Sequence, residues 1–391
     1  MNVLHLCNKV PYPGRDGSTL AMEALVRVLV QSGNHVTTLA LNTRKHWVEK
    51  PSYPKEWGEK ARLIAVPANT TPTLFGAIWA YFNRIPYTVS RFHTKRYEKA
   101  LVHLLQLQYY DAIVVDGLTQ AVYLDELKEC GLPVFYRAHN VEYRIWEHVL
   151  KGTRNPLKRR FLQREIESLR GFETDMWTTF QENWAITPED ASAMNGWALP
   201  CTVGQWPEAV NPPSARLFHM GALDWAPNVE GLQWLIQSVW PLVREALPQA
   251  ELTVFGRGKR LREFHLPEQG IRARSAPGPY ATATQEMGIS LIPLWSGSGM
   301  RIKALDAMAN NKALVSTSLG IEGIGFLDGE HGWVADTPAS FARAIVQAVT
   351  DASERERRTR QAHAFAQLNF ADERWATEVS EHLKRFKHFR F

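Results

Sequence analysis

The segment from 289 to 323 limits most narrowly what this chain can fold into. Residues 289–294 form a short apolar run, which is typical of a strand buried in a parallel sheet. Small residues follow, and from Met300 the apolar positions recur at helical spacing. A second apolar run begins at Ala313. This order predicts a strand–loop–helix–strand unit whose loop lies at the mouth of a parallel sheet.

The loop and the start of the helix carry residue types that attract a phosphate group. Amides at a helix N-terminus point outward and bear partial positive charge. Arg301 and Lys303 add full positive charges beside them, and Asp306 lies near the helix start. The alternative is an ordinary core unit with two solvated cations, because glycine-rich strand–helix turns are common in α/β domains. Two glycines, two cations and a carboxylate within ten residues favour the phosphate site.

The length of the chain predicts two domains. Its 391 residues exceed what one hydrophobic core usually serves. Two successive α/β halves are expected, and the proline-rich stretch 196–216 is the candidate connection. We expect an N-terminal domain at 1–200, a C-terminal domain at 201–370, and a tail at 371–391 that can pack back on the first domain. The predicted fold class is α/β, with two parallel sheets facing each other across a cleft.

The first half opens with a similar unit. A strand at 2–7 leads into a turn-rich loop containing Gly17, and a helix capped by Ser18 leads to a second strand at 35–41. Ligands of open α/β sheets bind beyond the carboxyl ends of the strands, which is where Gly17 lies. The loop has no GxGxxG pattern and no acidic residue ends the second strand, so this is not a dinucleotide fingerprint.

A polar group follows the expected strand at 133–138. His139, Asn140 and Glu142 come directly after it. They are therefore expected at the same edge of the sheet as Gly17. The alternative for His139 is a hydrogen-bonded structural histidine.

Composition excludes several function classes. The net charge of +5 suits phosphate-bearing small molecules or an anionic membrane, and no basic stripe of the kind that binds nucleic acid dominates. The three cysteines are far apart and form no CxxC pattern, which favours a reducing compartment over a disulfide framework or a zinc site. We see no signal peptide, and the apolar run 74–82 is too short to span a bilayer. A cytoplasmic location is expected.

The stretch 151–170 holds seven basic and two acidic residues. Most such runs are solvated helix faces. A basic amphipathic helix can also rest on an anionic membrane, and the apolar run 74–82 would then lie near a lipid-linked acceptor. Both interpretations remain open from the sequence.

Five segments in order resemble the retaining glycosyltransferases of family 4, which have the GT-B fold of two Rossmann-like domains. The last two are similar to segments of a bacterial subgroup that usually assembles surface polysaccharide or glycolipid. The segments are VLHLCNKVPYPGRDGS, FYRAHNVEYRIW, WAITPED, FHMGALDWAPNVEGLQWL and SGSGMRIKALDAMANNKALVSTSLGIEGI.

The resemblance implies a nucleotide-sugar donor held mainly by the second domain and a glycan or lipid-linked acceptor held by the first. It implies that His139 sits near the transferred sugar and that the cations neutralise the leaving diphosphate. The implied donor-binding residues are Gly17, Gly221, Ser298, Gly299, Met300, Arg301 and Lys303. The implied catalytic residues are His139, Arg301, Lys303 and Asp306, with Asn140 and Glu142 on the acceptor side.

The sequence also departs from the family pattern. Two glutamates eight positions apart are common in the family, and Ser298 and Asp306 occupy those positions here. The basic residue that usually follows the Gly221-type glycine is absent, since Ala222 comes next. No DxD-like carboxylate pair occurs, so no metal or other cofactor is expected. For retention, the resemblance suggests same-face transfer in which the leaving phosphate takes the acceptor's proton.

Two other function classes stay open at this point. A nucleotide-dependent oxidoreductase could use paired Rossmann folds, but the glycines at 256 and 258 are a weak signal without an acidic partner. The missing glutamate also leaves open a non-catalytic protein that binds sugar nucleotides.

Overall fold

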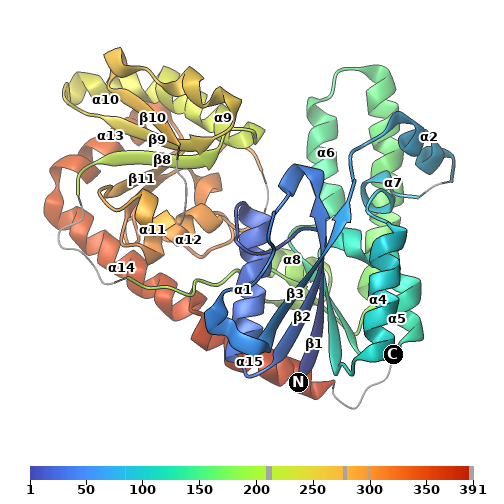
Figure 1. Cartoon of the computed structure of the whole chain (residues 1–391). Coiled ribbons are helices and arrows are strands. Elements are labelled where there is room, and N and C mark those ends of the chain that lie inside the picture. Colours follow the sequence, from blue (N-terminus) through green and yellow to red (C-terminus); the bar gives the residue numbers. More distant parts are fainter. Residues whose placement is uncertain (84, 208–213, 276–279, 298, 387–391) are drawn as a thin grey trace. The chain divides into compact units, whose positions relative to one another are not determined.

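The computed structural model describes the chain except residues 84, 208–213, 276–279, 298 and 387–391. The chain divides into two compact units. Unit 1 comprises Met1–Thr202 and Asp372–Phe391, and unit 2 comprises Val203–Ala371. Each unit contains one parallel sheet with helices on both faces (Figure 1). The predicted class, α/β with two Rossmann-like parallel sheets, is confirmed.

Unit 1 is built on a seven-stranded sheet in the order β3-β2-β1-β4-β5-β6-β7, in which every neighbouring pair is parallel. The central strands β1, β4 and β5 are buried along almost their whole length, as expected for strands covered on both faces. The strands are β1 (Asn2–Cys7), β2 (His35–Thr43), β3 (Ala61–Ala68), β4 (Ala112–Asp116), β5 (Val134–Ala138), β6 (Glu182–Ala185) and β7 (Trp197–Ala198).

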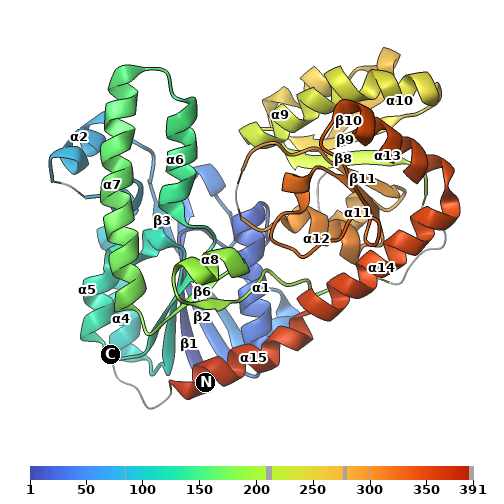
Figure 2. The same ribbon diagram turned by 180° about the vertical axis from the view of Figure 1, so that it is seen from behind.

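The two faces of this sheet have separate cores. Val3 and Val114 pack with α1 and α15, whereas Leu4 and Ile113 pack with α4. Figure 2 shows α6 and α7 as a hairpin of long helices in the same unit. The helices are α1 (Gly17–Gln31), α2 (Leu74–Asn83), α3 (Tyr87–Ser90), α4 (Lys95–Leu107), α5 (Leu124–Glu129), α6 (Glu142–Gly152), α7 (Pro156–Thr179), α8 (Pro188–Ala193) and α15 (Asp372–Arg385).

The last helix, α15, belongs to unit 1 although it follows unit 2 in the chain. Trp375 and Val379 contribute to the core beneath α1. Arg27 of α1 donates from Nε to the buried carboxylate of Asp372 at 2.8 Å. Apolar packing and this ion pair together attach α15 to α1.

Unit 2 repeats the plan with a six-stranded parallel sheet in the order β10-β9-β8-β11-β12-β13. Its strands are β8 (Leu217–Ala222), β9 (Leu252–Arg257), β10 (Ile271–Ser275), β11 (Ile289–Ile292), β12 (Ala313–Ser316) and β13 (Trp333–Val334). Its helices are α9 (Ala226–Trp234), α10 (Trp240–Ala246), α11 (Tyr280–Ala283), α12 (Ile302–Ala309), α13 (Pro338–Thr350) and α14 (Ala352–Phe370).

The strand order places a reversal point in each sheet. In unit 1 the chain builds β1, β2 and β3 to one side and then returns to place β4 on the other side of β1. In unit 2, β8 and β11 have the same relationship. Ligands of open α/β sheets bind beyond the carboxyl ends of such a strand pair. The residues after Cys7 and Asp116, and those after Ala222 and Ile292, therefore define the two candidate ligand sites.

Several local expectations need correction. The first helix is capped by Asp16 rather than by Ser18, since the Asp16 carboxylate accepts from the Thr19 amide at 3.0 Å. The strand expected at 35–41 extends further, over His35–Thr43. The stretch 196–216 contains the division between the units, although residues 208–213 of it lie outside the described part.

Among the described residues, no helix combines the length and apolar character needed to span a bilayer.

Candidate active site

The unit 2 site begins with the loop between β11 and α12. Gly297 has φ of 109° and Gly299 has φ of 80°, a region that favours glycine. A Cβ on Gly297 would also lie 3.1 Å from the Trp225 ring. The N-terminus of α12 has no side-chain cap and no acidic residue in its first turn. Its partial positive charge is therefore not offset by a carboxylate of its own.

Lys303 lies on the first turn of α12 and is held by a neighbouring amide. Its Nζ donates to Oδ1 of Asn228 at 2.5 Å, and Nδ2 of Asn228 donates to the carbonyl of Ala222 at 2.9 Å. A Cβ on Gly221 would lie 2.7 Å from the Asn228 amide nitrogen, so the glycine makes room for it. Gly221 and Lys303 were predicted as separate site residues from the sequence, and Asn228 connects them.

The environment of Lys303 weakens its hold on a proton. Burial, followed by the positive charge of Arg301, lowers the pKa of Lys303 to about 7. A bound anion would supply the missing negative charge and favour the protonated amine. The site is thus electrostatically suited to an anion. Without an anion, part of the Lys303 population is neutral at about pH 7.

His219 was not selected from the sequence. Its Nδ1 donates to the Leu291 carbonyl at 2.9 Å, whereas Nε2 has no hydrogen-bond partner among the described residues. Burial, followed by the charge of Lys303, lowers the pKa of His219 to about 3. The ring is therefore neutral and presents Nε2 as an acceptor. The available signal was a polar residue inside the apolar run Leu217–Ala222.

Arg301 is bonded inside unit 2. Nε donates to the Leu319 carbonyl at 2.8 Å, and one terminal nitrogen reaches the Gly297 carbonyl and a Glu322 carboxylate oxygen, each at 3.1 Å. Only 3% of its side chain is exposed. The resemblance described above implies that this guanidinium faces a diphosphate. In the structure it links the glycine loop to the segment after β12, and its contact with a donor stays a prediction.

The other expected donor-side residues are placed as follows. Met300 is buried and Gly299 is half-buried in the loop before α12. Asp306 is half-buried on α12. The pKa of Tyr280 is raised mainly by the burial of Tyr280 and next by the negative charge of Asp306. Ser298 lies outside the described residues. The roles of these residues stay predictions.

The unit 1 site is centred on Asp116, the last residue of β4. Its buried carboxylate lies 2.9 Å from Nε2 of His5, 2.6 Å from Nε2 of His139 and 3.4 Å from a guanidinium nitrogen of Arg137. Burial alone would raise the pKa of Asp116, but Arg137 and His139, with hydrogen bonds from His139 and His5, hold it well below its usual value. Asp116 is thus an ionised acceptor shared by two histidines.

This network bears on metal binding. His5, Cys7 and Asp116 are the group of possible metal ligands found among the described residues, with ligand atoms within 4.8 Å of one another. The Asp116 oxygen that faces His5 also faces Arg137, whose positive charge opposes a cation. The group fits a hydrogen-bonded network better than a metal centre, and metal independence stays a prediction.

The Gly17 end of unit 1 differs electrostatically from the α12 end of unit 2. Asp16 caps α1, and its carboxylate also accepts from Nζ of Lys9 at 3.2 Å and from the Ser18 hydroxyl at 2.9 Å. A carboxylate of the chain therefore already occupies the position that an anion would take at this helix. The expected approach of a diphosphate to Gly17 stays a prediction, and the unit 2 site is the better anion site.

Glu142 begins α6 on the carboxyl side of β5, together with the half-buried Asn140. Burial raises the pKa of Glu142 to about 7, although Lys9 opposes the rise. The neighbouring Glu173 accepts from the amides of Glu142 and Tyr143 at 3.0 and 3.1 Å. The structure thus brings His139, Asn140 and Glu142 together at one edge of the unit 1 sheet.

Comparisons with known proteins cover the chain in different ways. Residues 214–351 match the family model described as "Glycosyl transferases group 1". A Klebsiella pneumoniae protein described as an uncharacterized 44.6 kDa protein in the cps region is 28% identical over 166 residues, or 40% of this chain. The alignment spans 43% of that relative's length.

Solved structures match almost the whole chain. A sucrose-phosphate synthase from Thermosynechococcus elongatus has a TM-score of 0.69 at 14% identity and covers 99% of both chains. Anabaena HepE, solved with UDP-glucose, has a TM-score of 0.67 at 12% identity over 98% of this chain and 100% of its own. S. aureus TarM, solved with fondaparinux, alpha-GlcNAc-glycerol and UDP, has a TM-score of 0.68 at 9% identity over 98% and 99%. At these identities the likeness establishes the fold, which is the GT-B fold.

Proposed function

We propose that this chain is a retaining glycosyltransferase that moves a sugar from a nucleotide-diphosphate sugar to a hydroxyl of a glycan, glycolipid or lipid-linked acceptor. The observation that carries the proposal is Lys303, held by Asn228 beside Gly221 at the first turn of a helix without a side-chain cap. This anion site lies at the reversal point of the unit 2 sheet and inside the segment that matches the glycosyltransferase model.

The difficult step is the departure of the nucleoside diphosphate from the anomeric carbon. The bond from that carbon to the phosphate oxygen breaks, the bond to the acceptor oxygen forms on the same face, and the acceptor's proton passes to the leaving phosphate. Negative charge grows on the phosphate, where preorganised donors are most effective. Lys303 and the amides at the start of α12 supply that stabilisation in this proposal, and no metal is invoked. Arg301 keeps the glycine loop in place through Gly297 and Leu319.

Unit 1 supplies the acceptor side in this proposal. An ionised Asp116 accepts a hydrogen bond from Nε2 of His139, which leaves the Nδ1 edge of the ring to face a sugar hydroxyl. Glu142, with its pKa of about 7, exchanges a proton readily near neutral pH. Asn140 and Glu142 therefore bind acceptor hydroxyls, and His139 contacts the transferred sugar.

The biological setting is assembly of bacterial surface polysaccharide. Support comes from the partial relative described as lying in a cps region and from neighbours of the same fold that were solved with UDP or UDP-glucose. The proposed location is the inner face of the cytoplasmic membrane, with the basic segment 151–170 toward anionic headgroups. The nucleotide base and the sugar are left to experiment.

A thermal-shift screen of UDP, GDP, ADP and their sugars tests donor binding, because a ligand that binds only the folded state raises the melting temperature. We expect one nucleotide series to stabilise the protein, and Lys303→Met to abolish that shift while Lys128→Met, at an exposed position on α5 of unit 1, preserves it. Transfer is then measured with the selected donor on lipid-linked and free glycan acceptors. Binding without transfer or hydrolysis on every pair would favour a non-catalytic sugar-nucleotide protein. A fluorescence change with NAD(P)H and no sugar-nucleotide binding would favour an oxidoreductase.

A further inference from the structure

Helix α2 exposes its apolar side to solvent. Phe75 is 81% exposed, Leu74 79%, Phe82 75%, Trp79 50% and Ile78 47%. These five positions follow the spacing i, i+1, i+4, i+5 and i+8, which is one side of a helix. A surface helix of a globular protein normally turns that side toward the core. A contiguous exposed apolar surface of this kind marks a contact with a partner or a membrane.

The opposite side of α2 is fixed to the protein. Ala80 is buried, and the ring of Tyr81 stacks on Phe161 of α7 with centroids 6.3 Å apart. Arg164 of α7 lies over the Tyr81 ring and donates from Nε to the Tyr81 carbonyl at 3.2 Å. These contacts with α7 fix the orientation of α2, so that its apolar side faces away from unit 1.

Exposed cations accompany this apolar side. Lys151, Arg154, Lys158 and Arg160 are exposed on the α6–α7 hairpin, and none has an ion-pair partner among the residues that the structure describes. Leu157 lies among them and is 81% exposed.

The acidic residues of this region do not neutralise those cations. Glu165 is buried, and its carboxylate accepts from the amides of Tyr87 and Thr88 at 3.0 and 2.8 Å. Glu147 pairs with Arg170, further along the hairpin. Glu167 is exposed on α7 and offsets part of the charge. The basic surface therefore remains available to an anionic partner.

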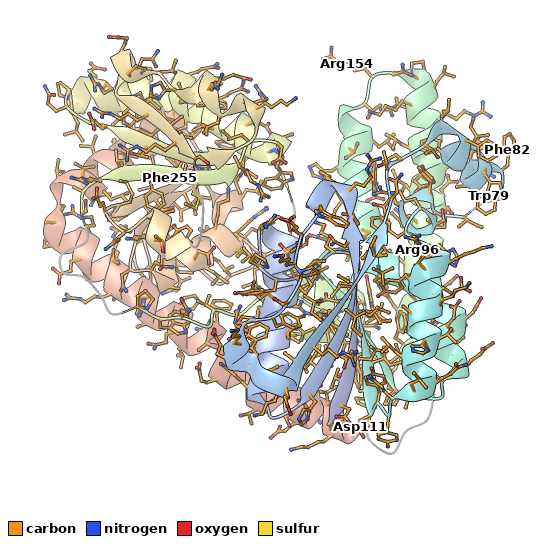
Figure 3. The ribbon with its side chains drawn as sticks, viewed as in Figure 1. Trp79, Phe82, Arg96, Asp111, Arg154 and Phe255 are labelled. Carbon is orange, nitrogen blue, oxygen red and sulfur yellow. The ribbon has the colours of Figure 1, made fainter. Side chains whose placement is uncertain are left out.

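The apolar and basic groups lie toward one end of unit 1. In Figure 3, Trp79 and Phe82 project from α2 away from α7, and Arg154 lies at the tip of the α6–α7 hairpin. Asp111, just before β4, lies at the opposite end of the unit (Figure 3). The tip is therefore on the carboxyl side of the sheet, where His139 and Glu142 lie. Helix α6 runs from Glu142 to the tip over roughly 16 Å, at about 1.5 Å per residue.

We propose that α2 and the tip of the α6–α7 hairpin form a docking surface for an anionic lipid bilayer. Phe75, Trp79 and Phe82 enter the boundary between headgroups and acyl chains, and the hairpin cations contact anionic headgroups. Charge complementarity selects this occupant: a purely apolar side would suit a second copy equally well, but the unpaired cations beside it would repel their own copies. The sequence left open that the basic stretch 151–170 rests on an anionic membrane with 74–82 near a lipid-linked acceptor, and the proposal now gives 74–82 itself the apolar contact with the bilayer.

This inference deepens the proposed function by giving a membrane-anchored acceptor a short route to His139. The docking itself needs no sugar donor. Its test can therefore fail while the transfer reaction holds, and the reverse can also occur.

The test is co-sedimentation of the full chain with vesicles of phosphatidylglycerol and phosphatidylcholine, compared with phosphatidylcholine alone. We expect binding to the anionic vesicles that weakens with added salt. Phe75→Ser with Phe82→Ser lowers the partition coefficient at least about tenfold by removing apolar contact. Lys158→Glu with Arg160→Glu lowers it at least about tenfold by reversing two charges. Tryptophan fluorescence that shifts to the blue on binding, and loses that shift in Trp79→Phe, reports insertion of α2.

Matched controls separate docking from general effects. Leu107→Ser replaces an apolar side chain of α4 that is 68% exposed, and Arg343→Glu with Lys384→Glu reverses two exposed charges on α13 and α15. Both controls retain binding within about twofold in this proposal. Equal losses in controls and α2 variants would overturn it. Dimerisation in solution that Phe75→Ser with Phe82→Ser abolishes, without vesicle binding by the native chain, would assign the surface to a second copy instead.

Discussion

Nε2 of His139 lies 2.6 Å from one carboxylate oxygen of Asp116, whose other oxygen lies 2.9 Å from Nε2 of His5. An ionised carboxylate can only accept, so both imidazoles carry their proton on Nε2. The tautomer of His139 is thereby set by a residue on a neighbouring strand. Asp116 is a positioning residue for the proposed sugar contact of His139.

Replacing Asp116 with Asn tests that relationship. The side-chain amide offers one acceptor oxygen for two ring N–H donors, so one histidine must change tautomer or rotate. We expect turnover to fall at least about a hundredfold, the scale of a disturbed proton-transfer group. The ¹⁵N shifts of His139 should change from the Nε2–H to the Nδ1–H pattern.

The control for this variant is Asp125→Asn, at an exposed carboxylate on α5. Cooperative thermal unfolding of Asp116→Asn establishes that the variant is folded. A folded variant with a changed His139 tautomer and normal turnover would contradict the positioning role.

The sequence predicted much of the fold because its strands are short apolar runs separated by helical patterns. The first strand was expected at 2–7 and is found at Asn2–Cys7. The Asp116 network was not predicted, because His5 and Asp116 are 111 positions apart in the chain. Such pairs form only once the strand order places β1 beside β4, and no local pattern encodes which polar residues then meet.

The second prediction concerns the pH dependence of donor binding. In the free protein the pKa of Lys303 is about 7. A bound diphosphate favours the charged amine and raises that pKa, so binding above about pH 7 must take up a proton. We therefore expect the affinity for a nucleotide sugar to fall by up to about tenfold per pH unit above about pH 7, and to level off below it. The diphosphate diester of the donor does not itself titrate in this range.

Calorimetry in two buffers of different ionisation enthalpy measures the proton uptake directly. Lys303→Met should bind more weakly at low pH and lose most of the pH dependence, while Lys303→Arg should remain charged throughout. An unchanged pH slope in Lys303→Met would show that another group titrates.

The third prediction separates Arg301 from its exposed partner. Arg301 donates to the carbonyls of Gly297 and Leu319 and pairs with Glu322, whose side chain is 57% exposed. Arg301→Ala leaves those carbonyls without their donor and releases the glycine loop. We expect kcat to fall at least about a hundredfold. Glu322→Gln should keep kcat within about threefold, because the two carbonyl contacts remain and an exposed ion pair contributes little.

Steady-state kinetics of both variants with the donor found by thermal shift provide the measurement. Near-normal turnover of Arg301→Ala would remove Arg301 from the mechanism. A large loss in Glu322→Gln would instead place the carboxylate itself in the reaction.

The unit 2 site shows what residue type and spacing can and cannot predict. Glycines and cations at 297–303 predicted an anion site, and this stays a prediction; the structure places Lys303 on the first turn of α12. The direction in which the Arg301 guanidinium points was not predictable from the sequence. Its acceptors lie in two separate segments, one before β12 in the chain and one after it. The hydrogen bond from Lys303 to Asn228 could not be predicted either, because 75 positions of the chain separate the two residues.

The last prediction uses the buried carboxyl of Glu173. Burial raises its pKa from the ordinary value of 4.5 to about 7, against the opposing effect of hydrogen bonds from two backbone amides. The folded state therefore holds a proton that the unfolded state releases once the pH passes about 4.5. The free energy of unfolding falls between about pH 4.5 and about pH 7 and then levels off, at a total loss on the order of 3 kcal/mol from this group.

Glu173→Gln removes that loss because the amide has no charge to bury. Urea unfolding should show the variant more stable than the native chain by on the order of 3 kcal/mol at about pH 8, and similar to it at about pH 4.5. Glu189→Gln, at an exposed carboxyl on α8, should change neither value. A variant less stable than the native chain at about pH 8 would mean that the two amide contacts need the full charge of Glu173. That charge would then be a structural element of the α6 N-terminus, next to the acceptor-side residues.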